Sequence, residues 1–309
     1  MKKILVTGGL GFIGSNFIAL LKQTNPEYKI INADKVTYAA HKDLIDSSIK
    51  NYYEDISDDV AIDNIFKDEQ PDFVVNFAAE THVDNSIKDP LVFVKTNVLG
   101  TANLLNCSLK YGVERFVQVS TDEVYGSIKQ GGFTEKSPIE PSSPYSASKA
   151  AADHLVHSYY KTYKLNVGIT RCSNNYGPNQ HNEKLIPHMV SKALRNEPLP
   201  VYGNGLNVRD WIHVKDHCRA VLAVLEGGKP GEVYNVGSSN EKTNIELVKT
   251  ILKLLGKSED LISYVEDRKG HDLRYAIDAT KIANELFWQP VVNFNEGFKQ
   301  TVEWYTKLQ

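Results

Sequence analysis

A glycine-rich turn between a short apolar stretch and a helical pattern constrains this chain more than any other feature. Residues 4–7 have the composition of a buried strand, and Gly8, Gly11 and Gly14 follow with the spacing G-x-G-x-x-G. The apolar residues from 12 to 24 then recur with a helical period. Glycines in this arrangement allow the main chain to approach a pyrophosphate, whose charge the helix N-terminus stabilises. The sequence therefore predicts a dinucleotide-binding unit.

An acidic residue follows the next apolar strand, where it would contact the adenosine ribose of the dinucleotide. Residues 28–33 form that strand and Asp34 ends it, about twenty residues after Gly14. A carboxylate there can accept hydrogen bonds from both ribose hydroxyls of NAD and would repel the 2′-phosphate of NADP. The alternative is that Asp34 only caps a turn. We expect NAD as the cofactor.

Alternating strands and helices predict the fold class. Apolar strands are expected at residues 4–7, 28–33, 51–53, 73–77, 116–119 and 167–170, and helices at 12–24, 59–69, 89–111 and 144–163. This alternation is typical of an α/β fold with a Rossmann-type doubly wound parallel sheet, whose ligands bind at the carboxyl ends of the strands.

The second half of the chain is less regular. Short strands are expected near residues 199–202, 208–214 and 233–236, a helix from Glu183 with Pro187 inside it, and another helix capped by Asn244. We therefore expect an NAD-binding domain over residues 1–173, rejoined by about 208–240, and a smaller mixed α/β domain, mainly for substrate binding, over 174–309.

Tyr145 and Lys149 lie four positions apart in a segment that begins like a helix. Ser143 is typical of an N-cap and Pro144 of the first helical position. The two side chains therefore share one helix face. A neighbouring ammonium lowers the pKa of a tyrosine from about 10 by stabilising the phenolate, which would make Tyr145 a base near neutral pH. The alternative is a half-exposed tyrosine beside a solvated lysine.

Two adjacent acids follow the strand predicted at residues 116–119. Thr121, Asp122 and Glu123 stand directly after it. Two close carboxyl groups push their pKa values apart, so one can donate a proton while the other accepts one. The alternative is that the pair only caps the N-terminus of a helix. We treat both acids as candidate catalytic residues.

Charge and cysteine usage exclude several other classes of protein. The formal charge of -3 results from 35 basic and 38 acidic residues without a long block of one sign, so no nucleic-acid or membrane partner is indicated. The three cysteines lie far apart, and the nine histidines follow no metal-binding spacing. No apolar stretch approaches the ~20 residues that span a bilayer. We expect a cytoplasmic protein that holds no metal.

Basic residues late in the chain are candidates for binding a phosphate group. Arg209 and Arg268 stand beside glycine and asparagine turns, and a guanidinium group matches the oxygens of a phosphate. A surface ion pair is the alternative for each arginine. In a chain with a dinucleotide-binding turn, we favour phosphate binding.

Six motifs together carry a resemblance to a known family. They are Gly8-Gly9-x-Gly11-Phe12-Ile13-Gly14, Thr121-Asp122-Glu123-Val124-Tyr125-Gly126, Tyr145-x-x-x-Lys149, Asn174-Asn175-Tyr176-Gly177-Pro178, Glu183-Lys184-Leu185-Ile186-Pro187 and Arg209-Asp210-Trp211. Over essentially its whole length the chain resembles the extended short-chain dehydrogenase/reductases. Thr121-Asp122-Glu123 resembles most specifically the sugar-nucleotide dehydratases of that family that act on dTDP-glucose.

The resemblance implies an activity and a role for each candidate catalytic residue. The activity is NAD-dependent dehydration of dTDP-glucose to dTDP-4-keto-6-deoxyglucose, a step of dTDP-L-rhamnose biosynthesis. Tyr145, with Lys149 lowering its pKa and Thr121 forming a hydrogen bond to the sugar, would take the 4-hydroxyl proton while a hydride passes from C4 to NAD. Glu123 would then remove the C5 proton while Asp122 protonates the departing 6-hydroxyl, after which the hydride returns to C6.

The resemblance also implies most of the binding residues. For NAD they are Gly8, Gly11, Phe12, Ile13, Gly14, Asp34, Lys35, Thr37, Asp55, Ile56, Phe77, Ala78, Ala79, Thr96, Tyr145 and Lys149. For the substrate they are Thr81, Ser86, Asn175, Lys184, Leu185, Pro200, Tyr202, Arg209, Asn244, Arg268, His271 and Tyr275.

Other interpretations remain open from the sequence. Another NAD-dependent nucleotide-sugar enzyme of this fold, a 4-epimerase or a UDP-glucuronate decarboxylase, is the nearest. A non-catalytic NAD-binding scaffold or sensor is more remote. A homodimer is expected through the helices near residues 90–111 and 144–163, and the alternative is that both helices pack only within the chain.

Overall fold

Seven parallel strands form the larger sheet, in the order β10-β6-β5-β4-β1-β2-β3. The computed structural model describes residues 1–267 and 270–308. The strands of this sheet are β1 (Lys3–Thr7), β2 (Lys29–Ala33), β3 (Lys50–Tyr52), β4 (Phe73–Asn76), β5 (Arg115–Thr121), β6 (Val167–Cys172) and β10 (Glu232–Val236). The strand order reverses between β1 and β4, so a ligand crevice is expected at their carboxyl ends. The predicted Rossmann-type fold is confirmed.

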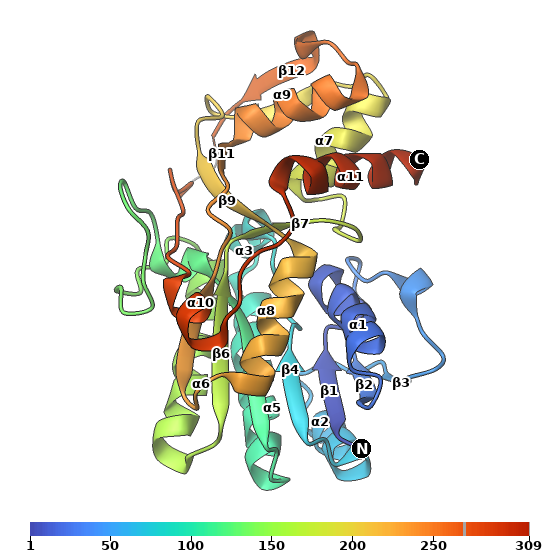
Figure 1. Ribbon diagram of the computed structural model, residues 1–309, viewed down its shortest axis with the longest axis vertical. Coiled ribbons are helices and arrows are strands. Elements are labelled where there is room, and N and C mark those ends of the chain that lie inside the picture. The colour runs from blue at the N-terminus through green and yellow to red at the C-terminus, as the bar shows by residue number, and fades with distance from the viewer. Residues whose placement is uncertain (268–269, 309) are drawn as a thin grey trace.

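Helices cover both faces of this sheet (Figure 1). One face packs against α1 (Phe12–Thr24) and α8 (Val214–Gly227), and the other against α2 (Asp59–Glu69), α5 (Gly100–Lys110) and α6 (Pro144–Tyr163). Strand residues alternate between the two cores: Ile4 and Val6 contact the α1 side, while Leu5 contacts the α2 side. Both faces are therefore buried, as in other parallel sheets.

The helix expected over residues 89–111 is not continuous. It consists of α4 (Pro90–Phe93), a π-helical segment η2 (Val94–Leu99) and α5, and α3 (Val83–Lys88) precedes it. The wider π turn places Asn97 inside the protein, where its Oδ1 accepts a hydrogen bond from the Glu80 amide at 2.8 Å. Its Nδ2 donates to Ser148 Oγ at 2.8 Å. The segment thus connects the residues after β4 to helix α6.

Two smaller sheets and three helices form the upper part of the structure in Figure 1. One sheet contains β7 (Asn174–Tyr176), β9 (Val208–His213) and β11 (Glu241–Thr243), and the other pairs β8 (Leu199–Tyr202) with β12 (Ile262–Val265). Helices α7 (Leu185–Leu194), α9 (Asn244–Leu255) and α11 (Phe294–Lys307) share a separate core. This part therefore buries its own apolar residues.

The chain returns to the larger sheet after β9. Helix α8, strand β10 and α10 (Thr280–Leu286) all pack there, whereas β9, which lies in the range expected to rejoin it, pairs with β7 and β11. The remaining short helices are η1 (Lys42–Leu44), η3 (Asp122–Tyr125) and η4 (Glu259–Leu261). The division into two domains stays a prediction.

Two helix starts differ from those expected. The N-cap of α9 is Thr243, whose hydroxyl accepts from the Glu246 amide, so Asn244 is the first helical residue and not the cap. Helix α7 begins at Leu185, which places Pro187 in its first turn. A proline there removes no helical hydrogen bond, because the first amides of a helix have no intrahelical acceptor.

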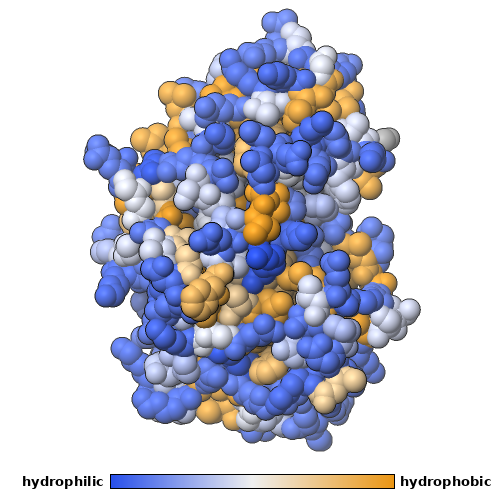
Figure 2. All heavy atoms as spheres, in the orientation of Figure 1, coloured by the Kyte–Doolittle hydropathy of each residue, from blue (hydrophilic) through white to orange (hydrophobic). Residues whose placement is uncertain are grey.

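The face of the molecule that Figure 2 shows is mostly hydrophilic, with hydrophobic residues scattered over it. None of the helices in residues 1–267 and 270–308 combines the length and the hydrophobicity that crossing a bilayer requires. Within the same ranges, no group of at least three His, Cys, Asp or Glu side chains is arranged to hold a metal ion.

Candidate active site

A cavity of about 720 Å³ lies between the carboxyl ends of the larger sheet and the two smaller sheets. It brings together nearly all of the site residues predicted from the sequence. Those that line it are Gly8, Gly11, Phe12, Ile13, Gly14, Asp34, Lys35, Thr37, Ile56, Phe77, Ala78, Ala79, Thr81, Thr96, Thr121, Asp122, Glu123, Tyr145, Lys149, Asn175, Lys184, Leu185, Pro200, Tyr202, Arg209, Asn244, His271 and Tyr275.

Two predicted residues do not line this cavity, and a third is outside the described residues. Ser86 is fully buried inside α3, where its hydroxyl donates to the Val83 carbonyl at 2.6 Å. Asp55 accepts from the Ser57 amide at 2.9 Å, so its carboxylate closes a local turn beside the cavity. Arg268 lies outside the described residues. The assignment of Ser86 to the substrate site stays a prediction.

The glycine turn packs tightly against the chain because Gly8 and Gly14 carry no side chains. Gly8 has a φ of +72°, and a Cβ atom there would lie 2.7 Å from the Ala78 amide nitrogen. A Cβ at Gly14 would lie 2.2 Å from the Gly8 carbonyl oxygen. Gly11 is the N-cap of α1 and provides no side-chain acceptor, so the first amides of the helix remain available to an anion. This arrangement fits the pyrophosphate of a dinucleotide.

Asp34 shapes the glycine turn as well as lining the cavity. Its Oδ2 accepts from the Leu10 amide at 3.0 Å and its Oδ1 from the Val36 amide at 2.8 Å. The capping role considered from the sequence is therefore real. Each carboxylate oxygen can accept a further hydrogen bond, so the same group can still meet ribose hydroxyls.

Tyr145 and Lys149 are both almost fully buried at the start of α6. The predicted cap is present: Ser143 and Ser146 form a capping box, and Pro144 is the first helical residue. The Lys149 ammonium donates to the Val119 carbonyl at 2.7 Å. Burial raises the pKa of Tyr145 well above its usual value, and the Glu123 carboxylate adds to the shift.

The direction of that shift corrects one prediction from the sequence. We expected Lys149 to lower the pKa of Tyr145, but in this structure the cost of burying a phenolate dominates. Burial also lowers the pKa of Lys149. The hydroxyl of Thr121 opposes the shift, because its hydrogen bond to Tyr145 lowers the tyrosine pKa.

Asp122 and Glu123 differ sharply in their surroundings. Both lie in η3, where the Thr121 hydroxyl accepts from the Glu123 amide at 3.2 Å. The Asp122 side chain is buried, whereas Glu123 is partly exposed. Burial raises the pKa of Asp122 well above its usual value, and the charges of Glu123 and Asp210 raise it further. Asp122 therefore keeps its proton at pH values at which an ordinary aspartate is ionised.

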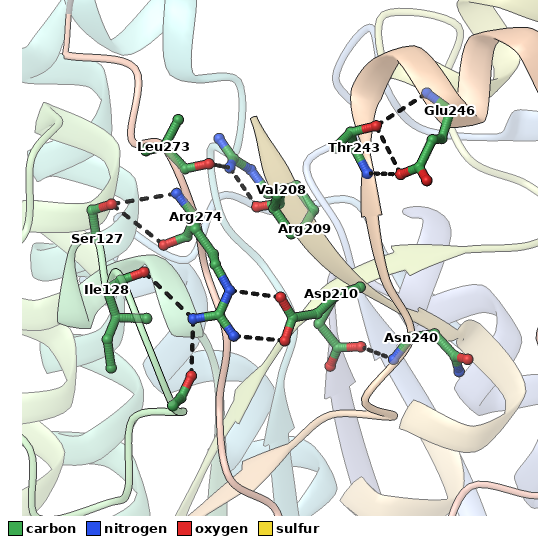
Figure 3. Close-up of polar contacts among 12 residues, drawn as sticks. Ser127, Ile128, Val208, Arg209, Asp210, Asn240, Thr243, Glu246, Leu273 and Arg274 are labelled. Carbon is green, nitrogen blue, oxygen red and sulfur yellow. Dashed lines mark hydrogen bonds and ion pairs between the residues drawn. The ribbon is translucent and has the colours of Figure 1, made fainter. Parts of the chain in front are cut away.

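Basic and aromatic groups line the opposite end of the cavity. The Arg209 guanidinium carbon lies 4.1 Å from the centre of the Tyr275 ring, and its NH2 donates to the Asp272 carbonyl at 2.9 Å. Figure 3 shows Arg209 beside Val208 and Leu273, whose carbonyl oxygens accept hydrogen bonds from its NH1 at 2.7 and 3.4 Å. These contacts are not the surface ion pair considered as an alternative for Arg209.

The loop that follows η3 forms hydrogen bonds with Arg274, the residue before Tyr275. Arg274 donates to the Gly131 carbonyl at 2.9 Å and to both carboxylate oxygens of Glu241 at 2.6 Å. Its main chain faces Ser127 in Figure 3, and its amide donates to the Ser127 hydroxyl at 3.3 Å. The segment that carries Tyr275 is thus held against the loop that follows the two acids.

Sequence reasoning missed one polar residue that lines the cavity and another that lies behind the lining residue Asn175. Asn174 lines the cavity, and its Oδ1 is buried without a hydrogen-bond partner among the described residues. His217 is completely buried, and its Nδ1 lies 3.0 Å from Asn175 Oδ1. Burial lowers the pKa of His217 to about 3, so the ring is neutral. The adjacent asparagines were a signal for Asn174, whereas nothing in the sequence marks His217.

Comparisons with known proteins agree with this geometry. Residues 5–301 match the family described as GDP-mannose 4,6 dehydratase. A dTDP-glucose 4,6-dehydratase of Xanthomonas campestris pv. campestris is 48% identical, over 99% of this chain and 93% of that protein.

Solved structures show the same similarity. The dTDP-glucose 4,6-dehydratase DesIV from Streptomyces venezuelae, solved with NAD and TYD bound, has a TM-score of 0.96 and 47% identity over 99% of this chain and 97% of its own. A UDP-glucose 4-epimerase from Thermotoga maritima, solved with UDP-glucose, has a TM-score of 0.94 but 32% identity, with 99% of each chain covered. The chain belongs to the 4,6-dehydratase family of the extended short-chain dehydrogenase/reductases, where its relatives include dTDP-glucose 4,6-dehydratases.

Proposed function

We propose that the chain converts dTDP-glucose to dTDP-4-keto-6-deoxyglucose and is thus an NAD-dependent hydro-lyase. The observation that carries this proposal is one cavity in which the glycine turn, the Tyr145–Lys149 pair and the Asp122–Glu123 pair all meet. The relatives named dTDP-glucose 4,6-dehydratase support the choice of substrate. The product would serve dTDP-L-rhamnose biosynthesis.

The residues around the glycine turn fit NAD. The first amides of α1 would bind the pyrophosphate, and Asp34 would accept hydrogen bonds from the adenosine ribose. Tyr145 and Lys149 line the part of the cavity where the reactive end of the dinucleotide would lie. When bound, NAD would supply an acceptor for the C4 hydride and the donor that returns it to C6.

Tyr145 would accept the proton of the sugar 4-hydroxyl. Its raised pKa means that a phenolate forms only where nearby positive charge offsets burial and Glu123. The Lys149 ammonium, one helical turn away, provides such a charge inside a buried site, where electrostatic interactions are strongest. The Thr121 hydroxyl supports the same step by its hydrogen bond to Tyr145.

The two acids would then expel water from the sugar. A ketone at C4 acidifies the C5 proton, which the Glu123 carboxylate can remove. Asp122 holds a proton because its pKa is raised, so it can donate to the 6-hydroxyl as that group leaves. The division of roles follows from burial, since Asp122 is enclosed and Glu123 is partly exposed.

The nucleotide would lie between the smaller sheets and α7. Lys184 and Arg209 bring positive charge to that end of the cavity and suit a diphosphate. Leu185, Pro200 and Tyr202 offer apolar surface for the base. The preference for thymidine is supported by the relatives and not by a contact in this structure.

A 4-epimerase is the second candidate, because a UDP-glucose 4-epimerase shares this fold at a TM-score of 0.94. An isotope experiment separates the two. Purified protein is given dTDP-glucose with deuterium at C4, and the product is examined by NMR and mass spectrometry. The proposal predicts loss of one water and deuterium on the C6 methyl group. An intact sugar with inverted C4 would support the epimerase, and NAD binding without turnover would support a scaffold.

We also propose a homodimer formed through the helices near residues 90–111 and 144–163. Several apolar side chains of α4 and η2, which lie in the first of these ranges, are exposed, including Leu91 at 74%, Val94 at 49% and Leu99 at 48%. Exposed apolar residues that gather in one short segment of chain mark an interaction surface more often than isolated ones do. The segments pack next to one another within the chain, so one surface can include both.

A further inference from the structure

A buried ion pair lies behind the candidate catalytic residues. Arg171 Nε donates to Asp153 Oδ2 at 2.9 Å, and the two side chains are only 7% and 3% exposed. Arg171 is the penultimate residue of β6, and Asp153 lies one helical turn after Lys149 on α6. Neither residue lines the cavity, so neither can contact a bound sugar directly.

Arg171 also holds the turn that carries the two acids. Its NH1 donates to the Tyr125 hydroxyl at 2.9 Å, and its guanidinium carbon lies 4.8 Å from the centre of the Tyr125 ring. The same hydroxyl donates to Asn235 Oδ1 on β10 at 2.8 Å. Tyr125 ends η3, which begins at Asp122. One guanidinium group therefore ties η3 to α6, the two elements that carry most of the candidate catalytic residues.

The stability of the fold does not require the Arg171–Asp153 ion pair between β6 and α6. Removing two ions from water carries a large desolvation cost, which well-packed apolar residues of similar volume avoid. Strand β6 is already paired in parallel with β5 on one side and β10 on the other. Asp153 Oδ1 has no hydrogen-bond partner among the described residues, so the carboxylate is not fully satisfied by Arg171 and its other contacts. The pair therefore needs an explanation besides stability.

The Asp153 carboxylate also acts on Lys149. Burial lowers the pKa of Lys149, and Asp153 opposes that effect, as does Cys172 on β6. Burial raises the pKa of Cys172 to about 12, so in the neutral range it is an uncharged thiol. The acids of η3, Asp122 and Glu123, act on the neighbouring tyrosine. Asp153 is thus the anion that favours a charged lysine here.

We propose that Asp153 and Arg171 are positioning residues for the dehydration: they fix η3 against α6, and Asp153 keeps the Lys149 ammonium charged. The inference deepens the proposed function and rests on it. It assigns two separable tasks to the ion pair. The tie to η3 passes through the Tyr125 hydroxyl, whereas the effect on Lys149 depends only on the charge of Asp153.

Two variants separate these tasks. Asp153→Asn removes the negative charge with little change of shape, and it should lower kcat at least about tenfold. It should also move the alkaline limb of the pH profile of kcat to lower pH by about one unit, because a buried lysine without a neighbouring anion loses its proton more easily. Tyr125→Phe keeps the ring and removes the tie, so it should lower kcat without moving that limb. KM for dTDP-glucose should change little in both variants.

Asp216→Asn is the matched control. Asp216 is as deeply buried as Asp153, but it accepts from the Val291 and Val292 amides at 3.1 and 2.9 Å and does not line the cavity. It should reduce the melting temperature and leave the position of the alkaline limb unchanged. If Asp153→Asn behaves in the same way, the ion pair is only structural and the inference is overturned.

A second measurement does not depend on turnover. The Lys149 ammonium is titrated in the full chain, and 13C NMR follows the resonance of the adjacent ε-carbon. That resonance is assigned by its absence from the spectrum of Lys149→Arg. Asp153→Asn should shift the titration midpoint to lower pH, and an unchanged midpoint would contradict the inference. Failure of the wild-type protein to convert dTDP-glucose would instead contradict the proposed function, and the NMR titration would still decide the role of Asp153.

Discussion

The ammonium of Lys149 donates a hydrogen bond to the carbonyl oxygen of Val119 at a distance of 2.7 Å. Val119 lies two residues before Thr121 on β5, and η3 continues directly from that strand. A side chain of α6 is therefore anchored on the strand that leads into the two acids. The relative placement of the Tyr145–Lys149 pair and the Asp122–Glu123 pair depends on this contact, and the predictions below follow from the placement.

Replacing Asp122 should block the loss of water but not the oxidation at C4. Asp122→Asn cannot donate the proton that the raised pKa of the aspartic acid retains, so kcat should fall by about 10²- to 10⁴-fold. Stopped-flow absorbance should show reduced NAD accumulating after dTDP-glucose is added. Absence of that signal, with full loss of turnover, would place Asp122 in the first step instead.

Replacing Asp34 should weaken the binding of NAD and reduce discrimination against NADP. Asp34→Asn keeps one oxygen acceptor for the main-chain amides of residues 10 and 36 but loses the negative charge. We expect NAD affinity to fall about tenfold or more, since a hydrogen bond to a charged group is worth about 1.5–3 kcal/mol. Calorimetry with both dinucleotides measures the ratio. Unchanged affinities would restrict Asp34 to capping the glycine turn.

His217 should make the wild-type protein sensitive to acid. Its pKa in the folded chain is about 3, below the ordinary value of 6.5, so its contribution to stability is complete above pH 6.5 and is lost as the pH falls toward 3. Between pH 6.5 and pH 3, the melting temperature of His217→Gln should fall less than that of the wild-type protein. At neutral pH it should be about 1 kcal/mol less stable, because the hydrogen bond to Asn175 changes.

The matched change for His217 is His154→Gln, at an exposed position of α6. It should follow the wild-type melting curve at every pH. If the two variants have the same acid dependence, the burial of His217 does not govern the response.

The exposed apolar residues of α4 should hold a dimer together. Leu91→Asp places a charge on a side chain that is 74% exposed in the single chain, and we expect it to shift the protein from dimer to monomer in analytical ultracentrifugation. Val60→Asp, on α2 at 66% exposure, is the control and should leave the dimer intact. A wild-type protein that sediments as a monomer would contradict the proposed dimer.

Local signals in the sequence were sufficient for the elements that begin and end with clear residues. The glycine turn predicted α1, and Ser143 with Pro144 predicted the start of α6, both of which the structure confirms. The alternation of strands and helices predicted the parallel sheet, because each element is built from contacts within a short stretch of chain.

Features that depend on packing between distant segments could not be predicted in this way. The π-helical segment Val94–Leu99 interrupts a sequence that suits a continuous helix. The rise in the Tyr145 pKa results from burial, which four-residue spacing does not reveal. The hydrogen bond from the Ser86 hydroxyl to the Val83 carbonyl is likewise visible only in the structure.

The repeated crossing of the chain between its larger and smaller sheets has a consequence for protein engineering. After β7 and β9 have entered a smaller sheet, α8 and β10 return to the larger one, and α9, α10 and α11 repeat the alternation. A chimera that exchanged the nucleotide-recognising half for that of another enzyme would need a junction at each crossing. New sugar specificities should therefore be easier to obtain by point substitution than by swapping segments.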